Sequence, residues 1–273
     1  MNQTTLIKQA EPQTNERSGS PVLLVFSDDW GRHPSSCQHL IAPLLNQYRV
    51  IWVNTIGMRP PRLDWSTVTR GLEKLKGWSS KPSETEKPLP ENLSVLQPVM
   101  WPWVKRSIDR TFNRHLLNRQ LTKSLDGIAG PVIAITTVPI VADLMESLPV
   151  DRWVYYCVDD FSQWPGLEQK TLGNLEQTVI EKADVLIAAG THLQQRLSTS
   201  RDEVHVLKHG LDLSLWNQVE HSASSQLLGD SAGPKITFWG LIDRRMDLSF
   251  VQRLSESISH GTINLIGPQD HPH

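Results

Sequence analysis

The run Pro21-Val-Leu-Leu-Val-Phe26, followed by the loop Ser27-Asp-Asp-Trp-Gly-Arg-His-Pro34, sets the architecture predicted for this chain. Five apolar residues in unbroken succession are typical of a strand buried on both faces, as the strands of parallel sheets are. After the loop, apolar residues return at helical spacing between Cys37 and Leu45, and Arg49–Asn54 is again strand-like. The start of the chain therefore predicts a βαβ unit.

The same alternation of strand and helix continues along the chain. Helices are predicted at about 104–125, 139–147, 167–182 and 191–198, and strands at Leu93–Gln97, Val132–Ile135, Trp153–Val158, Asp184–Ala188 and Val204–Leu207. Repeated βαβ units form a doubly wound parallel sheet with right-handed crossovers. We therefore predict an α/β, Rossmann-like domain over residues 21–213, preceded by a disordered leader at 1–20.

A polar segment at 214–234, rich in serine and glycine, is typical of a linker between domains. After it, Lys235–Trp239 and Thr262–Ile266 are strand-like, and apolar residues between Leu248 and Ile258 keep helical spacing. A βαβ unit of about 40 residues is too small to bury its own faces. We therefore expect residues 235–273 to be the first βαβ unit of an incomplete second Rossmann-like domain, and the chain to be a fragment.

Charge and cysteine content exclude several classes of protein. With 27 Lys and Arg against 29 Asp and Glu, the net charge is −2, so the general attraction on which nonspecific nucleic-acid binders depend is missing. The two cysteines, Cys37 and Cys157, supply neither a disulfide framework nor a four-ligand zinc site. The leader lacks the apolar core of a signal peptide, and every apolar run is far below the ~18 residues that span a bilayer. We expect a cytoplasmic protein with no nucleic-acid partner and no metal site.

Polar and aromatic side chains follow the first predicted strand, namely Asp28, Asp29, Trp30, Arg32 and His33. Open α/β sheets bind ligands at the carboxyl ends of their strands, beside helix N-termini. The loop lacks the GxGxxG fingerprint of dinucleotide binding, which argues against a dehydrogenase. A capped turn with solvated charges is the structural alternative.

A second candidate site ends the predicted strand at Tyr155–Phe161, where Asp159 and Asp160 are adjacent. Because side chains alternate along a strand, we expect only one of these carboxylates to face a cleft, while the other caps the turn. Paired carboxylates can serve as a general base or hold a metal. A purely structural turn is again the alternative.

Two glycines near later strand ends, Gly210 and Gly240, offer backbone N–H groups that a phosphate or sugar can approach closely. His209 precedes the first glycine, and Arg244 and Arg245 follow the second, where they can meet phosphate oxygens. The alternatives are a hydrogen-bonded structural histidine and a solvated arginine pair.

Residues 101–123 are basic in a chain that is otherwise not. Trp101 and Trp103 precede a predicted helix with one apolar stripe (Val104, Ile108, Phe112 and Leu116) and five basic residues over the rest of its surface (Lys105, Arg106, Arg110, Arg114 and Arg119). This composition is typical of a helix lying on an anionic membrane surface. The same stripe would also pack against a sheet.

In their order, these pieces of residues 21–268 resemble the GT-B glycosyltransferases, specifically the bacterial capsule, exopolysaccharide and teichuronic-acid type related to the glycogen-synthase-like family. The segments that carry the resemblance are Asp28–Pro34, Thr136–Pro139, Tyr156–Phe161, Ala183–Ile187, Val206–Asp212 and Trp239-Gly240. It implies two facing Rossmann-like domains, with the acceptor bound mainly by the first and a nucleotide-sugar donor mainly by the second. The chain departs from the family at Leu241, where an arginine often follows the glycine, and the donor-ribose glutamate motif would lie beyond His273.

The resemblance implies transfer of a sugar from a nucleotide sugar to a lipid-linked or polysaccharide acceptor in cell-surface polysaccharide synthesis, without a cofactor. We expect Asp160 to handle the acceptor proton, with Asp159 in reserve, the residues of the first loop to bind the acceptor, and donor binding to involve His209, Gly210, Gly240 and Arg244. The alternatives are a nucleotide-sugar epimerase, which needs no acceptor, and a non-catalytic acceptor-binding fragment. We expect the chain alone to be inactive, and its location to be the cytoplasm or the inner face of the plasma membrane.

Overall fold

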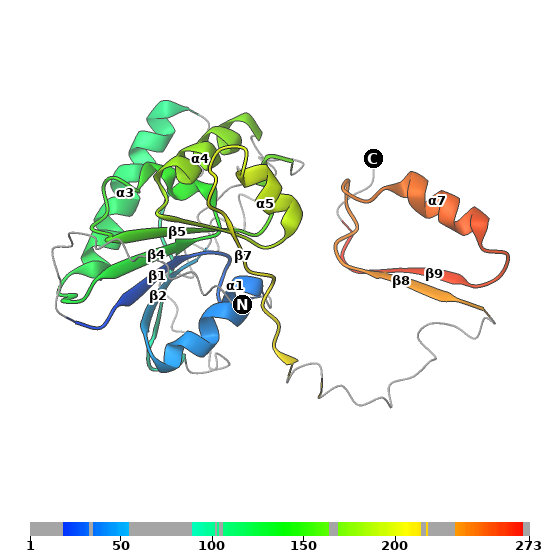
Figure 1. The fold of residues 1–273 in the computed structure, drawn as a ribbon, viewed down its shortest axis with the longest axis horizontal. Helices are drawn as coiled ribbons and strands as arrows, with labels where there is room; N and C mark the ends of the chain where they lie inside the picture. Colours follow the sequence, from blue (N-terminus) through cyan, green and yellow to red (C-terminus); the bar gives the residue numbers. More distant parts are fainter. Residues whose placement is uncertain are drawn as a thin grey trace, which may run out of the picture. The chain divides into compact units, whose positions relative to one another are not determined.

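The computed structural model describes residues 19–32, 35–54, 89–101, 103, 106–163, 169–213, 217 and 233–269. The chain divides into two compact units (Figure 1). The first runs to Asp159 and includes Asn174–Gly210, and the second consists of Asp160–Gly173 and the chain from Leu211 onward. Nearly all of the predicted linker at 214–234 lies outside the described residues.

A seven-stranded parallel sheet forms the centre of the first unit. Its strands are β1 (Val22–Phe26), β2 (Arg49–Val53), β3 (Leu93–Leu96), β4 (Val132–Thr136), β5 (Arg152–Cys157), β6 (Val185–Ala188) and β7 (His205–Val206). The strand order is β3-β2-β1-β4-β5-β6-β7, so the sheet grows in opposite directions on the two sides of β1. This is the order of a doubly wound sheet. The predicted fold class is confirmed.

Helices cover both faces of this sheet. They are α1 (Ser36–Ile41), α3 (Ser107–Leu125), α4 (Gln169–Lys182) and α5 (Thr191–Leu197). Figure 1 shows α3 and α4 on one face and α1 on the other. All five residues of β1 are buried, because the strand lies between two others and is covered on both faces. This burial on both faces explains why all five residues of β1 are apolar.

Two predicted helices take a different form. The single helix predicted between Cys37 and Leu45 is two elements in the structure. The α-helix α1 ends at Ile41, and a 3₁₀ helix follows over Ala42–Asn46. Pro43 has no N–H to continue the α-helical bonds. The helix predicted at 139–147 is a 3₁₀ helix over Pro139–Asp143 followed by tight turns, and short segments of this kind commonly take i→i+3 bonds.

The second unit contains the predicted βαβ element, with β8 (Lys235–Trp239), α7 (Leu248–Ser257) and β9 (Thr262–Ile266). The two strands pair in parallel, and the Asp247 carboxylate caps α7 by accepting a hydrogen bond from the Phe250 amide at 2.9 Å. Within residues 233–269 no side chain is buried. Local pairing and capping define this element, because it has no core of its own.

Candidate functional site at the carboxyl edge of the sheet

The loop after β1 is held by groups at the carboxyl end of the neighbouring strand β2. The Trp52 indole donates from Nε1 to the Asp28 carbonyl at 2.9 Å, and the Trp30 amide donates to Asn54 Oδ1 at 3.0 Å. The rings of Trp30 and Trp52 meet edge to face with centroids 4.9 Å apart. These contacts fix the backbone path of the loop and leave Trp30 half-buried.

The acidic side chains of this loop are oriented by polar neighbours. Asp28 Oδ2 accepts a hydrogen bond from Gln38 Nε2 at 3.4 Å, and the Arg32 guanidinium pairs with Asp29 at 3.2 Å. The structure thus brings together three of the predicted acceptor-binding side chains, Asp28, Asp29 and Arg32, on one short loop. His33, which was predicted to join them, lies outside the described residues.

Asp159 follows β5 at the same edge of the sheet. Because β1, β4 and β5 are parallel neighbours, the ends of β1 and β5 are two strand spacings, or about 10 Å, apart. The prediction that both loops share the carboxyl edge is confirmed. Asp159 and Asp160 are both half-buried, and Asp160 accepts a hydrogen bond at its carbonyl from the Gln163 amide at 3.0 Å.

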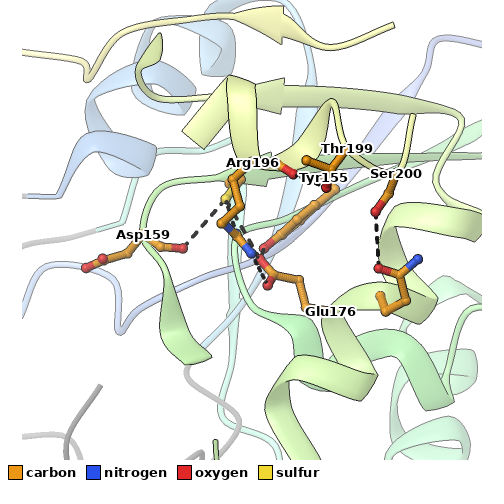
Figure 2. Close-up of polar contacts among 8 residues, drawn as sticks. Tyr155, Asp159, Glu176, Arg196, Thr199 and Ser200 are labelled. Carbon is orange, nitrogen blue, oxygen red and sulfur yellow. Dashed lines mark hydrogen bonds and ion pairs between the residues drawn. The ribbon is translucent and has the colours of Figure 1, made fainter. Parts of the chain in front are cut away.

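A buried polar cluster adjoins the end of β5 (Figure 2). Arg196 on α5 makes two hydrogen bonds to the Glu176 carboxylate on α4, at 2.7 and 2.8 Å. The Tyr155 hydroxyl donates to the same carboxylate at 2.6 Å, and the Cys157 thiol donates to the Asp159 carbonyl at 3.6 Å. The cluster therefore ties two helices to β5, the strand that Asp159 follows.

Burial makes this cluster sensitive to substitution. Desolvation raises the pKa of Tyr155 well above its usual value, and the neighbouring Cys157 and Glu176 add to the effect. Our sequence reasoning missed Glu176, although a signal was present. Leu172, Leu175 and Val179 mark the buried face of α4, and Glu176 falls on that face, where a carboxylate needs a partner.

The segment that follows β7 lies against the first turn of α1. The Gly210 amide donates to Ser36 Oγ at 2.9 Å, and the Tyr156 hydroxyl, 3.2 Å from the same oxygen, donates to the Leu207 carbonyl at 3.1 Å. A Cβ at Gly210 would lie 2.9 Å from Leu40 Cγ. Glycine is therefore required here by close packing.

This contact involves the backbone group of Gly210 that we expected to serve donor binding. We expected its N–H to be directed at a donor diphosphate, but the N–H donates to Ser36 instead. The neighbouring His209 is exposed. Ser36 and Tyr156 were not among the predicted site residues, although tyrosine at the second-to-last position of a strand lies by necessity near the carboxyl edge.

In the second unit, the Gly240 amide is likewise hydrogen-bonded within the protein. Its amide N–H donates to the Ile266 carbonyl at 3.0 Å and so extends the pairing of β8 with β9. Arg245 forms an ion pair with Asp243 at 2.9 Å, whereas the adjacent Arg244 is exposed. The predicted donor-side residue Arg244 therefore lies at an exposed position of this unit.

Thiolate chemistry is excluded by burial of both cysteines. Desolvation raises the pKa of Cys37 to about 12 and also raises the pKa of Cys157. Both thiols are therefore protonated near neutral pH and are poor nucleophiles. Within the described part of the chain, no group of three or more His, Cys, Asp and Glu side chains is placed to hold a metal ion.

Among the residues described, none of the helices has the length and apolar character needed to cross a membrane.

Comparison with solved structures places this geometry in a known architecture. No known family and no curated protein matches the sequence. The structure of sucrose-phosphate synthase (tll1590) from Thermosynechococcus elongatus superposes with a TM-score of 0.61 at 14% identity, covering 92% of this chain. This chain has a Rossmann-like, GT-B glycosyltransferase fold.

The chain spans 63% of the length of that synthase. Two further matches have lower TM-scores. Arabidopsis thaliana UGT89C1, complexed with UDP-L-rhamnose, has a TM-score of 0.47 at 12% identity, covering 93% of this chain and 70% of that one. A UDP-glucosyltransferase from Polygonum tinctorium has a TM-score of 0.43 at 9% identity, covering 93% and 72%.

Proposed function

We propose that this chain belongs to a glycosyltransferase of the hexosyl type, which moves a sugar from a nucleotide sugar to a lipid-linked or polysaccharide acceptor in cell-surface polysaccharide synthesis. One observation carries the proposal. The polar loop after β1 and the carboxylates after β5 share the carboxyl edge of a sheet in a GT-B fold. This edge is where open α/β sheets bind their ligands.

The proposed chemistry needs one group for the acceptor proton. The acceptor hydroxyl oxygen forms a bond to the anomeric carbon of the donor sugar, and the bond from that carbon to the phosphate oxygen breaks. The nucleoside diphosphate leaves with the electron pair, and the hydroxyl proton passes to the Asp160 carboxylate acting as general base. Asp159, which adjoins it in the chain, is the reserve for this role.

The acceptor is assigned to the loop after β1. The Asp28 and Asp29 carboxylates accept hydrogen bonds from sugar hydroxyls, the Arg32 guanidinium donates to sugar oxygens, and the Trp30 ring offers an apolar face. Contacts with Gln38, Arg32 and Trp52 hold these groups in place before the acceptor arrives. Such preorganisation lowers the entropic cost of binding.

The donor is assigned to side chains rather than to the two glycine amides, which are hydrogen-bonded within the protein. Arg244 and His209 are both exposed. The Arg244 guanidinium is suited to the leaving diphosphate, because its planar N–H groups match phosphate oxygens. We further propose that the enzyme works in the cytoplasm, at the inner face of the plasma membrane, where a lipid-linked acceptor is found.

Incubation of the complete gene product with labelled nucleotide sugars tests this function. Glycan and polyprenyl-phosphate-linked acceptors are supplied in separate reactions, and products are resolved by mass spectrometry. The proposal predicts a labelled acceptor and free nucleoside diphosphate. Conversion of the nucleotide sugar to its epimer without an acceptor would identify an epimerase instead, and binding of the acceptor without turnover of any donor would indicate a non-catalytic binding protein.

A further inference from the structure

One side of α3 exposes apolar side chains that a sheet-packing helix normally buries. The buried side of this helix carries Asn113, Leu117, Leu121 and Leu125. The predicted apolar stripe lies away from that side, with Ile108 74% and Phe112 49% exposed. Our alternative that the stripe packs against the sheet is therefore wrong for these two residues. Val104 lies outside the described residues.

Two tryptophans extend this exposed area beyond the start of the helix. The buried Asn113 side chain accepts a hydrogen bond from the Trp101 amide at 2.7 Å and donates to the carbonyls of Trp101 and Trp103 at 3.0 Å. The two indoles contact each other in a tilted arrangement with centroids 4.8 Å apart, and Trp101 meets Phe112 edge to face at 6.2 Å. The aromatic cluster is thus held in place while it remains exposed to solvent.

Basic side chains lie along the same helix. Arg110 makes two hydrogen bonds with Asp143 at 2.5 and 2.8 Å, so its charge is neutralised within the protein. Four others are exposed, namely Arg106, Arg114, Arg119 and Lys123. With Asp109 and Asp126 as the acidic residues of the segment, the surface keeps an excess of two positive charges in a chain whose net charge is −2.

An open groove of about 890 Å³ runs along this side of α3. Its lining includes Ile108 and Phe112 at the apolar end and Arg114, Arg119 and Lys123 farther along the helix. Apolar and cationic groups thus share one continuous surface. This combination fits a partner that presents anionic groups and an apolar layer side by side.

We propose that the α3 surface, formed by Trp101, Trp103, Ile108, Phe112, Arg106, Arg114, Arg119 and Lys123, docks on an anionic phospholipid bilayer. Charge complementarity selects this partner, because lipid phosphates pair with the cations while the aromatic rings lie among the headgroups. A nucleic acid offers no apolar layer for Ile108 and Phe112. Docking does not depend on the proposed reaction, although it would bring a lipid-linked acceptor to the enzyme.

Flotation with vesicles tests the proposal, because bound protein rises with the lipid and aggregates do not. The full chain is mixed with phosphatidylcholine vesicles that contain or lack about 30 mol% phosphatidylserine, at about 0.1 M and 0.5 M salt. Binding should require the anionic lipid and should fall at the higher salt. Equal binding to both kinds of vesicle, or binding that ignores salt, would overturn the proposal.

Charge-reversal variants locate the surface. The triple variant Arg114→Glu, Arg119→Glu and Lys123→Glu should lower the partition coefficient about 100-fold or more, since each cation near an anionic surface contributes about fivefold. The control triple Lys170→Glu, Lys235→Glu and Arg253→Glu makes the same change in net charge at exposed positions elsewhere. Binding of the control should stay within a few-fold of the parent. Equal losses in both variants would show that net charge alone acts.

The apolar contribution is measured with Ile108→Ser and Phe112→Ser. Because both side chains are largely exposed, these changes should leave the thermal midpoint nearly unchanged while they weaken vesicle binding at least tenfold. Circular dichroism confirms that each variant is folded. Unchanged vesicle binding in a folded double variant would overturn the assignment of these residues to the membrane contact. Loss of catalysis with intact docking would instead count against the proposed reaction.

Discussion

The backbone N–H of Gly210 donates a 2.9 Å hydrogen bond to the Ser36 hydroxyl, although 174 positions of the sequence separate the two residues. Ser36 begins the helix that follows the loop with Asp28, and Gly210 is the last residue of the first unit. The chain therefore leaves the first unit directly beside the predicted acceptor loop.

Substitution of Gly210 by alanine should loosen this contact. The added Cβ would lie 2.9 Å from Leu40 Cγ and 3.0 Å from the Ser36 carbonyl, which is closer than normal packing allows. Overpacking of this kind costs about 1–3 kcal/mol. Urea unfolding measures this loss of unfolding free energy.

Gly173→Ala is the matched control, because nothing lies within 4 Å of its Cβ, and alanine in α4 should raise stability by about 0.5–1 kcal/mol. Equal midpoints for the two variants would contradict the packing account.

Glu176→Gln should lower stability strongly, because it removes the charge of a buried carboxylate that pairs with the largely buried Arg196 guanidinium. Breaking a buried ion pair on one side costs about 3–5 kcal/mol. Urea unfolding measures this loss of unfolding free energy. Glu181→Gln, at an exposed position of the same helix, should leave the unfolding midpoint nearly unchanged. A loss below about 1 kcal/mol for Glu176→Gln would show that the pair contributes little.

Stability should fall in alkali partly because of Cys37. Burial raises the pKa of its thiol from 9.0 to about 12, so the unfolded chain loses this proton at a lower pH than the folded one. The stabilisation is therefore fully present below pH 9.0 and is lost as the pH rises to about 12. Unfolding free energies measured from pH 8 upward should decline less steeply for Cys37→Ala than for the parent, by about 1.4 kcal/mol per pH unit. An equal decline of the unfolding free energy with pH in both proteins would contradict the raised pKa of Cys37.

The central strands could be predicted from the sequence because they are short, largely apolar runs, as Val22–Phe26 shows. The first predicted helix ends early where Pro43 intervenes, and the helix predicted at 139–147 is a short 3₁₀ helix instead. Contacts between residues far apart in the sequence could not be predicted, because they leave no pattern in the sequence around either residue. Nothing near Gly210 indicates Ser36 as its partner, and nothing near Arg110 indicates Asp143. The edge that holds the candidate site was therefore predictable, whereas the internal hydrogen bonds of the two glycine amides were not.

Purified residues 1–273 should not transfer sugar. Within residues 233–269 no side chain is buried, and large apolar groups such as Trp239 are exposed, so the donor side lacks a packed support for Arg244. The same exposure should cause association at high concentration, which light scattering detects. Sustained turnover of a nucleotide sugar by the purified chain would contradict this prediction.

The most direct test of the proposed reaction is the rate of labelled sugar transfer by the complete gene product before and after Asp160→Asn. The amide keeps the size of the side chain but cannot accept the acceptor proton, so transfer should fall about 10²–10⁴-fold with the thermal midpoint unchanged. Asp202→Asn, at an exposed position away from the candidate site, is the matched control and should keep the parent rate. An Asp160→Asn variant that transfers sugar within a few-fold of the parent rate would contradict the assignment of Asp160 as the general base.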